Sequence, residues 1–319
     1  MPVNDGRYLE QSVGSILSQT LSNFELVIAT DALDSGSVDL LRDCAQHDPR
    51  IRVHERDRPA GAIVTANEAV AHARAALIAR MDADDIAHPD RLRRQVEVFQ
   101  DRPDTVLVGA MSDGIDANGR RTRPPDRARL RRRDAFVPFP HGSAMFRRAA
   151  FDHVGGYRQA CAGWEELDLF LRLAAHGRVF VLPDVLFHYR YRENSLTTGR
   201  SPRDHERVLA QQRRCIAAYR AGRSYEDLLE GMTLADSTPG GRADAYASRA
   251  AHLFWSGGRP PVWLPWRAAN LRALLYGLWG AASPGTLRFV LRRWISVRDR
   301  LAGRDIGDGP YEWHFASSS

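Results

Sequence analysis

The stretch LIARMDADDIAHPDRL at residues 77–92 joins an apolar run, three carboxylates and the start of a helix. Residues 77–81 are typical of a buried strand, and Asp82, Asp84 and Asp85 follow at its carboxyl end. Ligands of an open α/β sheet bind at that end, where a hard divalent cation bridging carboxylates to a diphosphate would relieve their repulsion. The alternative is an acidic turn that caps the following helix, because Asp is common in both places.

Apolar, β-rich runs alternate with helical patterns on both sides of this stretch, which predicts an α/β domain with a largely parallel sheet. The expected strands are residues 24–29, 51–54, 77–81, 105–111, 143–146 and 179–182. The expected helices are residues 8–19, 38–45, 63–73, 89–100 and 165–176. From about Pro202 the pattern is helical without convincing strands. The sequence therefore predicts a domain over residues 1–200 and a helical region over residues 201–319.

The composition excludes several classes of protein. Of 319 residues, 44% are hydrophobic and the formal net charge is only +6, so the chain is not mostly disordered. It contains no lysine, which excludes a Schiff base to pyridoxal phosphate and a phosphate-loop lysine. Its cysteines, Cys44, Cys161 and Cys215, form no CxxC pair. They fit neither a disulfide framework nor a zinc site and favour a reducing, cytoplasmic compartment.

Neither a secretory signal nor a spanning helix is expected. Residues 1–6 lack a charged region followed by an apolar one. The longest uncharged apolar run, residues 273–287, contains three glycines and a proline. It is also shorter than the roughly 20 residues that a spanning helix needs.

Four blocks of sequence resemble glycosyltransferase family 2 over residues 2–195. They are residues 6–28, 78–92, 141–157 and 164–195, with an order and spacing similar to the family's. The resemblance implies a GT-A fold, a Rossmann-like α/β architecture with a mixed, mostly parallel sheet flanked by helices, to which the helical pattern after Pro202 adds a helical C-terminal extension. It also implies an inverting glycosyltransferase that uses Mn²⁺ or Mg²⁺. The expected donor is UDP-, GDP- or dTDP-linked, and the expected acceptor is a glycan or lipid-linked molecule of cell-surface polysaccharide or glycoconjugate synthesis.

The resemblance assigns the donor side to five residues. Pro2, Asp31 and Asn67 are expected to bind the nucleotide sugar, with Asp31 at the position that hydrogen-bonds the base. Asp82 resembles the acidic residue near the ribose and the metal, and Asp84 resembles the one that binds the metal. A turn aspartate is the alternative for Asp31.

The resemblance also assigns the acceptor side. Glu166 falls where the family carries its general base, with Glu165 beside it, and a carboxylate there would take the proton of the attacking hydroxyl. The alternative for both is a pair of first-turn acids that complement a helix dipole. Trp164 is expected to pack on a sugar and His141 to line the acceptor side, the alternatives being a buried tryptophan and a satisfied histidine.

Several positions depart from the family's pattern. The first apolar strand is missing or truncated, Thr30-Asp31-Ala32-Leu33 replaces Asp-Asp-Gly-Ser, and Ala66 and Arg192 replace an arginine and a histidine. A non-catalytic member that binds a partner or a glycan is therefore the alternative function. The Gln-x-x-Arg-Trp motif of processive synthases is also absent, with Val290 in place of glutamine, which favours transfer of a single sugar.

Two arginine-rich stretches allow more than one interpretation. Residues 287–301 form an apolar stripe bordered by arginines. This predicts a helix that docks on the catalytic domain or lies peripherally on the anionic inner face of the plasma membrane. Residues 120–133 predict a solvated loop or a flap over an anionic substrate. Nucleic-acid binding rests only on this run and a pI of 9.6, and no aromatic interleaving or recognisable module supports it.

Overall fold

The computed structural model describes residues 1–123, 125, 139–192, 202–226, 229 and 310–313. By its contacts the chain divides into two units. The first is Met1–Ser112 with Arg129–Tyr189 and Ile306–His314, and the second is Asp113–Ala128 with Arg190–Asp305 and Phe315–Ser319. The domain boundary at residue 200 stays a prediction, because most of residues 201–319 lie outside the described residues.

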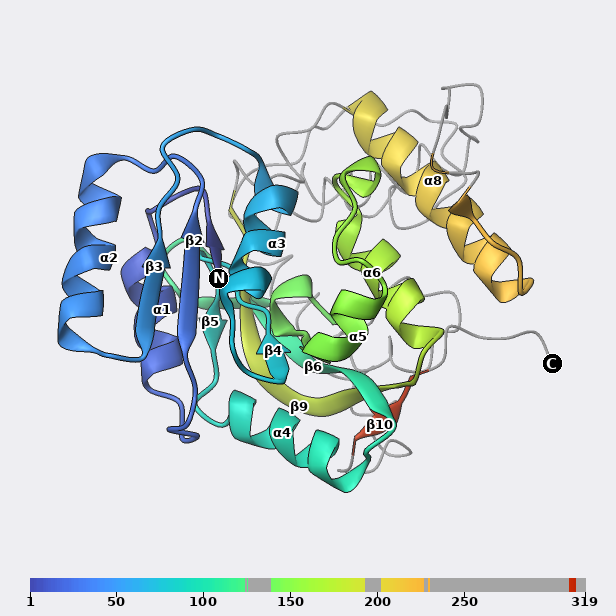
Figure 1. Ribbon diagram of the computed structural model, residues 1–319, viewed down its shortest axis with the longest axis horizontal. Coiled ribbons are helices and arrows are strands. Elements are labelled where there is room, and N and C mark those ends of the chain that lie inside the picture. The colour runs from blue at the N-terminus through green and yellow to red at the C-terminus, as the bar shows by residue number, and fades with distance from the viewer. Residues whose placement is uncertain (124, 126–138, 193–201, 227–228, 230–309, 314–319) are drawn as a thin grey trace, which may run out of the picture. The chain divides into compact units, whose positions relative to one another are not determined.

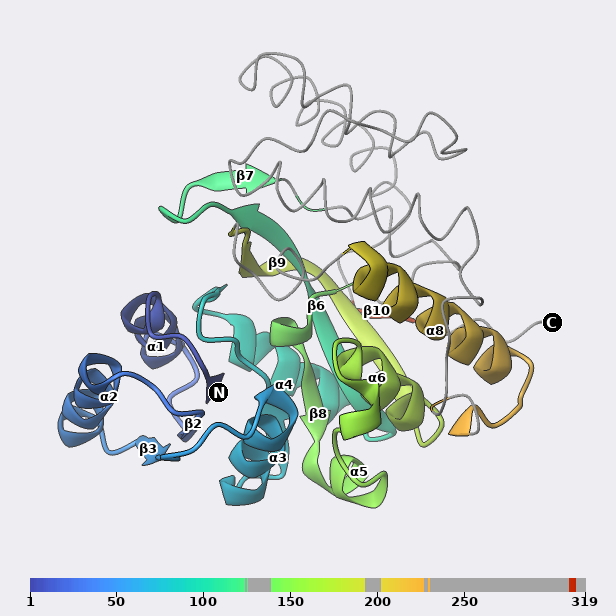
Figure 2. The same ribbon diagram turned by 90° about the horizontal axis from the view of Figure 1, so that it is seen from above.

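A small parallel sheet opens the first unit. Its strands, in the order β1-β2-β3, are β1 (Pro2–Val3), β2 (Leu26–Thr30) and β3 (Ile51–His54). Its helices are α1 (Leu9–Leu17), α2 (Ser35–His47) and α3 (Ala62–His72). Figure 2 shows α1 and α2 on one side of the strands and α3 on the other. Leu26 and Ile28 of β2 are buried in one cluster with Leu9 and Val13 of α1 and with Leu41 of α2.

The first strand, predicted to be missing or truncated, is present as two residues. Pro2 lies opposite Ala29, and Val3 lies opposite Thr30, both in parallel register with β2. The strand therefore still forms an edge beside the end of β2, where Asp31 follows.

The larger sheet carries the acidic turn. Its order is β10-β9-β6-β8-β4, with β5 paired to β9 and β7 paired to β6. The strands are β4 (Leu77–Ala79), β5 (Ile86–Ala87), β6 (Thr105–Ile115), β7 (Arg121–Arg123), β8 (Met145–Arg147), β9 (Arg178–Arg190) and β10 (Tyr311–Glu312). In Figure 1, helix α4 (Arg91–Asp101) lies on one side of this sheet and α5 (Arg148–His153) and α6 (Glu165–Ala174) on the other. Two 3-10 turns, His141–Ser143 and Gln159–Cys161, complete this part of the chain.

The α/β class with mixed sheets flanked by helices is confirmed, but the preponderance of parallel pairing is not. Parallel pairs join β1, β2 and β3, whereas β4–β8, β6–β8, β5–β9, β6–β7 and β10–β9 are antiparallel. Short connections such as the turn between β6 and β7 permit antiparallel neighbours, which need no crossover helix. The strand β10 also corrects the expectation of no strands after Pro202, because two residues are too few to show a period of two.

The second unit is described only in part. Arg190 Nη1 donates to the carbonyls of Asp116 and Ala117 at 3.0 and 3.2 Å. The helix α8 (Pro202–Arg220) agrees with the helical pattern expected there. Most of the arginine-rich stretch at 120–133 and all of residues 273–287 and 287–301 lie outside the described residues, so their interpretations stay predictions.

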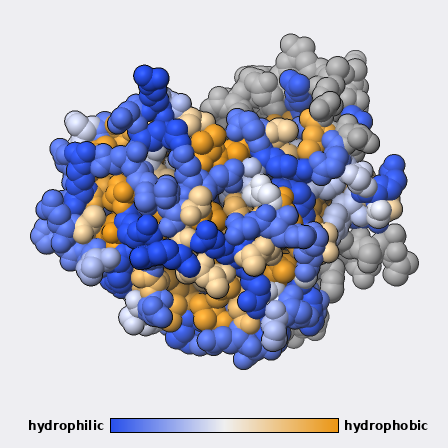
Figure 3. All heavy atoms as spheres, viewed as in Figure 1, coloured by the Kyte–Doolittle hydropathy of each residue, from blue (hydrophilic) through white to orange (hydrophobic). Residues whose placement is uncertain are grey.

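Hydrophilic side chains cover most of the face seen in Figure 3, with smaller apolar areas between them. Single exposed apolar residues are normal on a folded protein and indicate no function by themselves. Among the described residues, no helix combines the length and the apolar character needed to cross a bilayer.

Candidate active site

The acidic turn after β4 leaves two carboxylates within reach of a ligand. Met81, Ala83 and Asp85 are 2%, 8% and 1% exposed and fix the turn. Asp82 and Asp84 are only partly buried. Carboxylate oxygens are the ligands that Mn²⁺ and Mg²⁺ prefer, so these two residues fit a hard divalent cation.

Arg80 pairs with the first of these carboxylates. Its Nη2 lies 2.6 Å from Asp82 Oδ1, and its Nη1 donates to the carbonyl of Met81. Burial on its own would raise the pKa of Asp82, but the charge of Arg80 and its hydrogen bond to the carboxylate outweigh burial, and the pKa is lowered. Asp82 is therefore ionised at neutral pH and paired with a cation whose side chain is 12% exposed.

Arg91 supports the turn from within the core. The side chain is 0% exposed, and its Nη2 donates to the carbonyls of Arg80 at 2.6 Å and Ala144 at 3.4 Å. Burial lowers the pKa of Arg91 to about 9, with Asp82 acting in the opposite direction. One side chain thus joins the residue before the acidic turn to the segment that carries His141.

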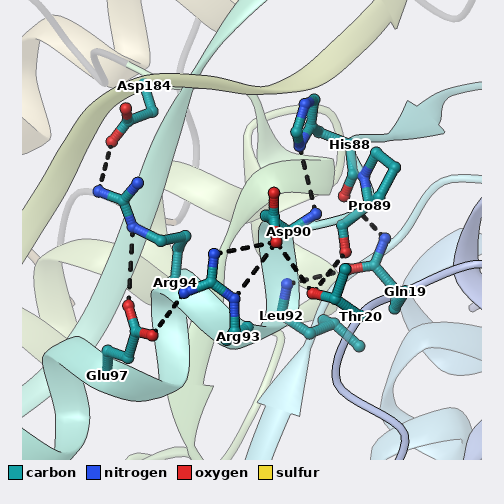
Figure 4. A network of polar contacts seen from close by, with 10 residues as sticks. All are labelled: Gln19, Thr20, His88, Pro89, Asp90, Leu92, Arg93, Arg94, Glu97 and Asp184. Carbon is teal, nitrogen blue, oxygen red and sulfur yellow. Dashed lines mark hydrogen bonds and ion pairs between the residues drawn. The ribbon is translucent and has the colours of Figure 1, made fainter.

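Polar contacts tie the helix after the turn to the end of α1 (Figure 4). Gln19 Nε2 donates to the His88 carbonyl at 2.8 Å, and the Leu92 N–H donates to Gln19 Oε1 at 3.0 Å. Thr20 Oγ1 donates to Asp90 Oδ1 at 3.0 Å. Because Gln19 bonds to both sides of this junction, the acidic turn runs into α4 with a defined direction.

His141 and Tyr157 form a neutral pair beside the acidic turn. The Nε2 atom of His141 lies 2.7 Å from the Tyr157 hydroxyl. Burial lowers the pKa of His141 to about 3, with Arg80 adding to the effect, and burial raises the pKa of Tyr157. A Cβ at Gly142 would lie 2.8 Å from Asp82 Oδ2, so glycine is what lets this turn approach the carboxylate so closely.

Glu165 and Glu166 occupy the first turn of α6, where unpaired backbone N–H groups favour carboxylates. Glu165 Oε2 accepts a hydrogen bond from the Gly163 N–H at 2.5 Å. One ligand atom each of His141, Glu165 and Glu166 lies within 4.8 Å of the others, a spacing that could hold a metal ion. The structure thus brings both predicted base residues next to a predicted acceptor-side residue.

Arg80 interacts electrostatically both with the acidic turn and with the group around Tyr157 and Glu165. Its charge interacts with Asp82, Tyr157 and Glu165, and the Tyr157 hydroxyl interacts with both glutamates. Sequence reasoning missed Arg80 and Tyr157 as site residues. The available signals were an arginine directly before the acidic turn and a tyrosine directly after a double glycine.

A buried ionic network holds α6 against the preceding loop. Asp168 is 0% exposed and accepts from Arg158 Nε at 3.1 Å and Arg172 Nη2 at 2.5 Å. Arg172 also donates to the carbonyls of Val154 and Gly156, both at 2.7 Å. Burial would raise the pKa of Asp168, but hydrogen bonds from both arginines lower it. The i, i+4 spacing of Asp168 and Arg172 is the signal that sequence reasoning passed over.

The residues expected to bind the nucleotide lie at the small sheet. Pro2 is in β1, and the Asp31 N–H donates to the Val3 carbonyl of the same strand at 2.8 Å. The Asp31 carboxylate accepts from the N–H groups of Ala60 at 2.6 Å and Gly61 at 3.0 Å. It therefore orders the loop between β3 and α3, as a turn aspartate would, and its contact with a base stays a prediction.

Two other predicted residues have structural contacts. The Asn67 side chain donates to the Tyr157 carbonyl and accepts from the Tyr157 N–H, both at 2.9 Å. Asn67 thus fixes the backbone beside the site, while its nucleotide role stays a prediction. Trp164 is 1% exposed, so no face of its ring is open to a sugar in this structure. This corrects the expectation of stacking on a sugar and agrees with the alternative of a buried tryptophan.

Comparison with known proteins adds independent information. The sequence matches Glycosyl transferase family 2 over residues 3–155. EpsE of Bacillus subtilis (strain 168) is 31% identical over 201 residues, which are 60% of this chain and 70% of EpsE. The O-antigen biosynthesis glycosyltransferase WbnJ of Escherichia coli is 30% identical over 200 residues, 59% of this chain and 76% of WbnJ.

A solved structure shows the same fold. The mannosyltransferase PcManGT from Pyrobaculum calidifontis, in complex with GDP-Man and Mn²⁺, aligns with a TM-score of 0.56 at 17% identity, covering 96% of this chain and 86% of that one. The architecture is therefore that of the GT-A fold. The chain belongs to glycosyltransferase family 2.

Proposed function

We propose that this glycosyltransferase is metal-dependent and inverting, and that it transfers one sugar from a nucleotide diphosphate donor to a glycan or lipid-linked acceptor. The observation that carries the proposal is the convergence of two carboxylate pairs. Asp82 and Asp84 follow β4, Glu165 and Glu166 begin α6, and Arg80 interacts with Asp82 and Glu165. A donor side and a base side thereby belong to one site.

The chemistry follows from this arrangement. Glu166 takes the proton of the acceptor hydroxyl while that oxygen forms a bond to the anomeric carbon from the side opposite the leaving group. The bond between the anomeric carbon and the phosphate oxygen breaks, and its electron pair goes to the departing diphosphate, so the configuration inverts. A Mn²⁺ or Mg²⁺ ion held by Asp84 and Asp82 would supply charge neutralisation for the diphosphate.

His141 and Tyr157 contribute no net charge to this reaction. Both are neutral at neutral pH because of burial, so they can orient a hydroxyl by hydrogen bonds without competing for its proton. Glu165, whose Oε2 is engaged by the Gly163 N–H, holds the start of α6 in place. This division of roles favours Glu166 as the base.

The relatives support a donor and an acceptor class. PcManGT was solved with GDP-Man and Mn²⁺, and WbnJ is named for O-antigen biosynthesis. We therefore propose a UDP-, GDP- or dTDP-linked donor and an acceptor in cell-surface polysaccharide or glycoconjugate synthesis. Val290, where processive synthases carry glutamine, favours a single transfer.

Asp84→Asn tests the proposal. The purified wild type is screened with UDP-, GDP- and dTDP-sugars and Mn²⁺ for release of the nucleoside diphosphate. The variant should lose on the order of 100-fold in rate, because a neutral amide binds a divalent cation weakly and several kcal/mol of charge stabilisation disappear. Circular dichroism should show the same fold in both proteins.

Asp90→Asn is the matched control. Asp90 lies six residues further along and pairs with Arg93 and Thr20 at the start of α4, so its loss should leave turnover within about twofold. Turnover by Asp84→Asn equal to that of the wild type would overturn the metal assignment. A folded wild type that acts on no donor and binds no nucleotide would favour the non-catalytic alternative.

A further inference from the structure

Arg80 occupies an unusual place for a cation. It precedes two carboxylates that fit a divalent ion, and its Nη2 lies 2.6 Å from Asp82 Oδ1. A metal that binds Asp82 must therefore compete with a positive charge already in contact with that carboxylate. Like charges at such short range repel by energies worth a tenfold or larger change in an equilibrium constant.

The contacts of Arg80 do not use all of its donors. Its Nη1 donates to the Met81 carbonyl and its Nη2 contacts Asp82. Its Nε is buried and has no hydrogen-bond partner in the part of the chain that the structure describes. A guanidinium offers five N–H donors in a planar fork that matches phosphate oxygens in pairs, so a diphosphate could satisfy Arg80 better than one carboxylate oxygen.

The backbone of Arg80 is anchored by contacts that do not involve its own guanidinium. The Arg80 N–H donates to the Ala144 carbonyl at 2.8 Å, and the Arg80 carbonyl accepts from the buried Arg91 at 2.6 Å. Exchange of the guanidinium between two anions therefore needs only side-chain rotation.

We propose that Arg80 makes metal binding depend on the donor: it holds Asp82 as a counter-ion until the diphosphate of a nucleotide sugar takes the guanidinium and leaves the carboxylate to the metal. The inference rests on the proposed donor and metal site. It predicts that the acidic turn binds a divalent ion tightly together with the donor and only weakly without it. Such coupling is reciprocal, so the metal strengthens donor binding by the same factor.

The test measures Mn²⁺ binding by the free-Mn²⁺ electron paramagnetic resonance signal, at pH 8, for the wild type, Arg80→Met and Arg80→Lys. Mn²⁺ is added alone and then with UDP or GDP. With Mn²⁺ alone, Arg80→Met should bind about tenfold more tightly than the wild type, because the competing charge is gone. Arg80→Lys keeps that charge and should remain within about threefold of the wild type.

Addition of nucleotide should favour Mn²⁺ binding by the wild type over binding by Arg80→Met. UDP or GDP should tighten Mn²⁺ binding by the wild type about tenfold more than it tightens binding by Arg80→Met, because the variant has lost the group that passes from carboxylate to diphosphate. Arg42→Met is the charge-matched control. It removes an exposed arginine that pairs with Glu55 at 2.7 Å, outside the site, and should leave both affinities unchanged.

The outcomes separate the inference from the proposed function. Equal Mn²⁺ affinity of wild type and Arg80→Met, in proteins that bind the ion and unfold at similar temperatures, overturns the inference and leaves the metal site standing. Weaker binding by Arg80→Met overturns it as well. No Mn²⁺ binding by any variant, with or without nucleotide, overturns both the inference and the metal-dependent function. Should Arg80→Met not fold, Arg80→Gln replaces it with the same expected tightening.

Discussion

Several ionisable side chains of the candidate active site have pKa values that are displaced by burial and by one another. His141 and Tyr157 are neutral, whereas Asp82 keeps its charge because Arg80 lies against it. Burial alone would neutralise all three. Arg80 therefore keeps Asp82 charged, whereas burial keeps His141 and Tyr157 neutral.

His141 gives this balance a measurable pH dependence. Its pKa is about 3 in the folded protein against 6.5 in the unfolded chain, so between these values only the unfolded state binds the proton. Stability is retained above pH 6.5 and falls as the pH drops below it. The contribution of His141 to the free energy of unfolding should fall by about 1 kcal/mol between pH 7.5 and 5.5.

Urea unfolding of wild type and His141→Gln at both pH values measures this part. Other titrating groups are common to the two proteins and cancel in the difference between their pH slopes. The variant should lose about 1 kcal/mol less stability than the wild type over this interval. Parallel slopes would show that His141 titrates as it does in the unfolded chain.

At the scale of elements, the helix α6 carries the predicted base, and buried ion pairs of its residue Asp168 fix its position. Asp168 binds arginines from two directions, one of them in the preceding loop. Arg172 extends the network to the carbonyls of Val154 and Gly156, directly before Tyr157. The direction of α6, and with it the position of Glu166, depends on this buried network.

Asp168→Asn should lower the free energy of unfolding by about 3 kcal/mol, because two arginines lose a buried counter-ion while the side-chain shape is kept. Denaturant unfolding provides the measurement. Asp48→Asn is the control, since Asp48 pairs with Arg50 at 2.7 Å with both side chains more exposed; its cost should stay below about 1 kcal/mol. Similar losses in both variants would mean that the α6 network acts as an ordinary surface pair.

At the scale of the whole molecule, donor and metal should stabilise the fold together. A ligand that binds only the folded state adds about 2.7 kcal/mol at a hundredfold excess over its dissociation constant. Thermal unfolding with UDP, GDP or dTDP should therefore shift upward for one nucleotide class in the presence of Mn²⁺. Most of the shift should disappear when EDTA removes the metal. A shift of the same size with EDTA would contradict the predicted role of Asp84.

Particular elements show how far sequence reasoning reached. Helices near residues 9–17, 62–72 and 91–101 and the strand at 51–54 were predicted within a few residues, because their apolar periodicity is local. The strand β9 (Arg178–Arg190) extends well beyond its predicted end at 182. Pro183 and Asp184 interrupt the local strand pattern, and the extension pairs through Phe187 and His188 with β5. The acidic turn and the first turn of α6 were also found from contiguous motifs.

The sequence by itself determined the α/β class, the resemblance to glycosyltransferase family 2 and the residues predicted to form both carboxylate pairs. Each of these depends on patterns among residues that are close together in the chain. Only the tertiary structure decided that Arg80, His141 and Tyr157 meet beside those pairs, that Trp164 is buried, and that Asn67 clamps the Tyr157 backbone. These features arise from contacts between residues far apart in the chain. Their charge states depend on burial, which no local pattern records.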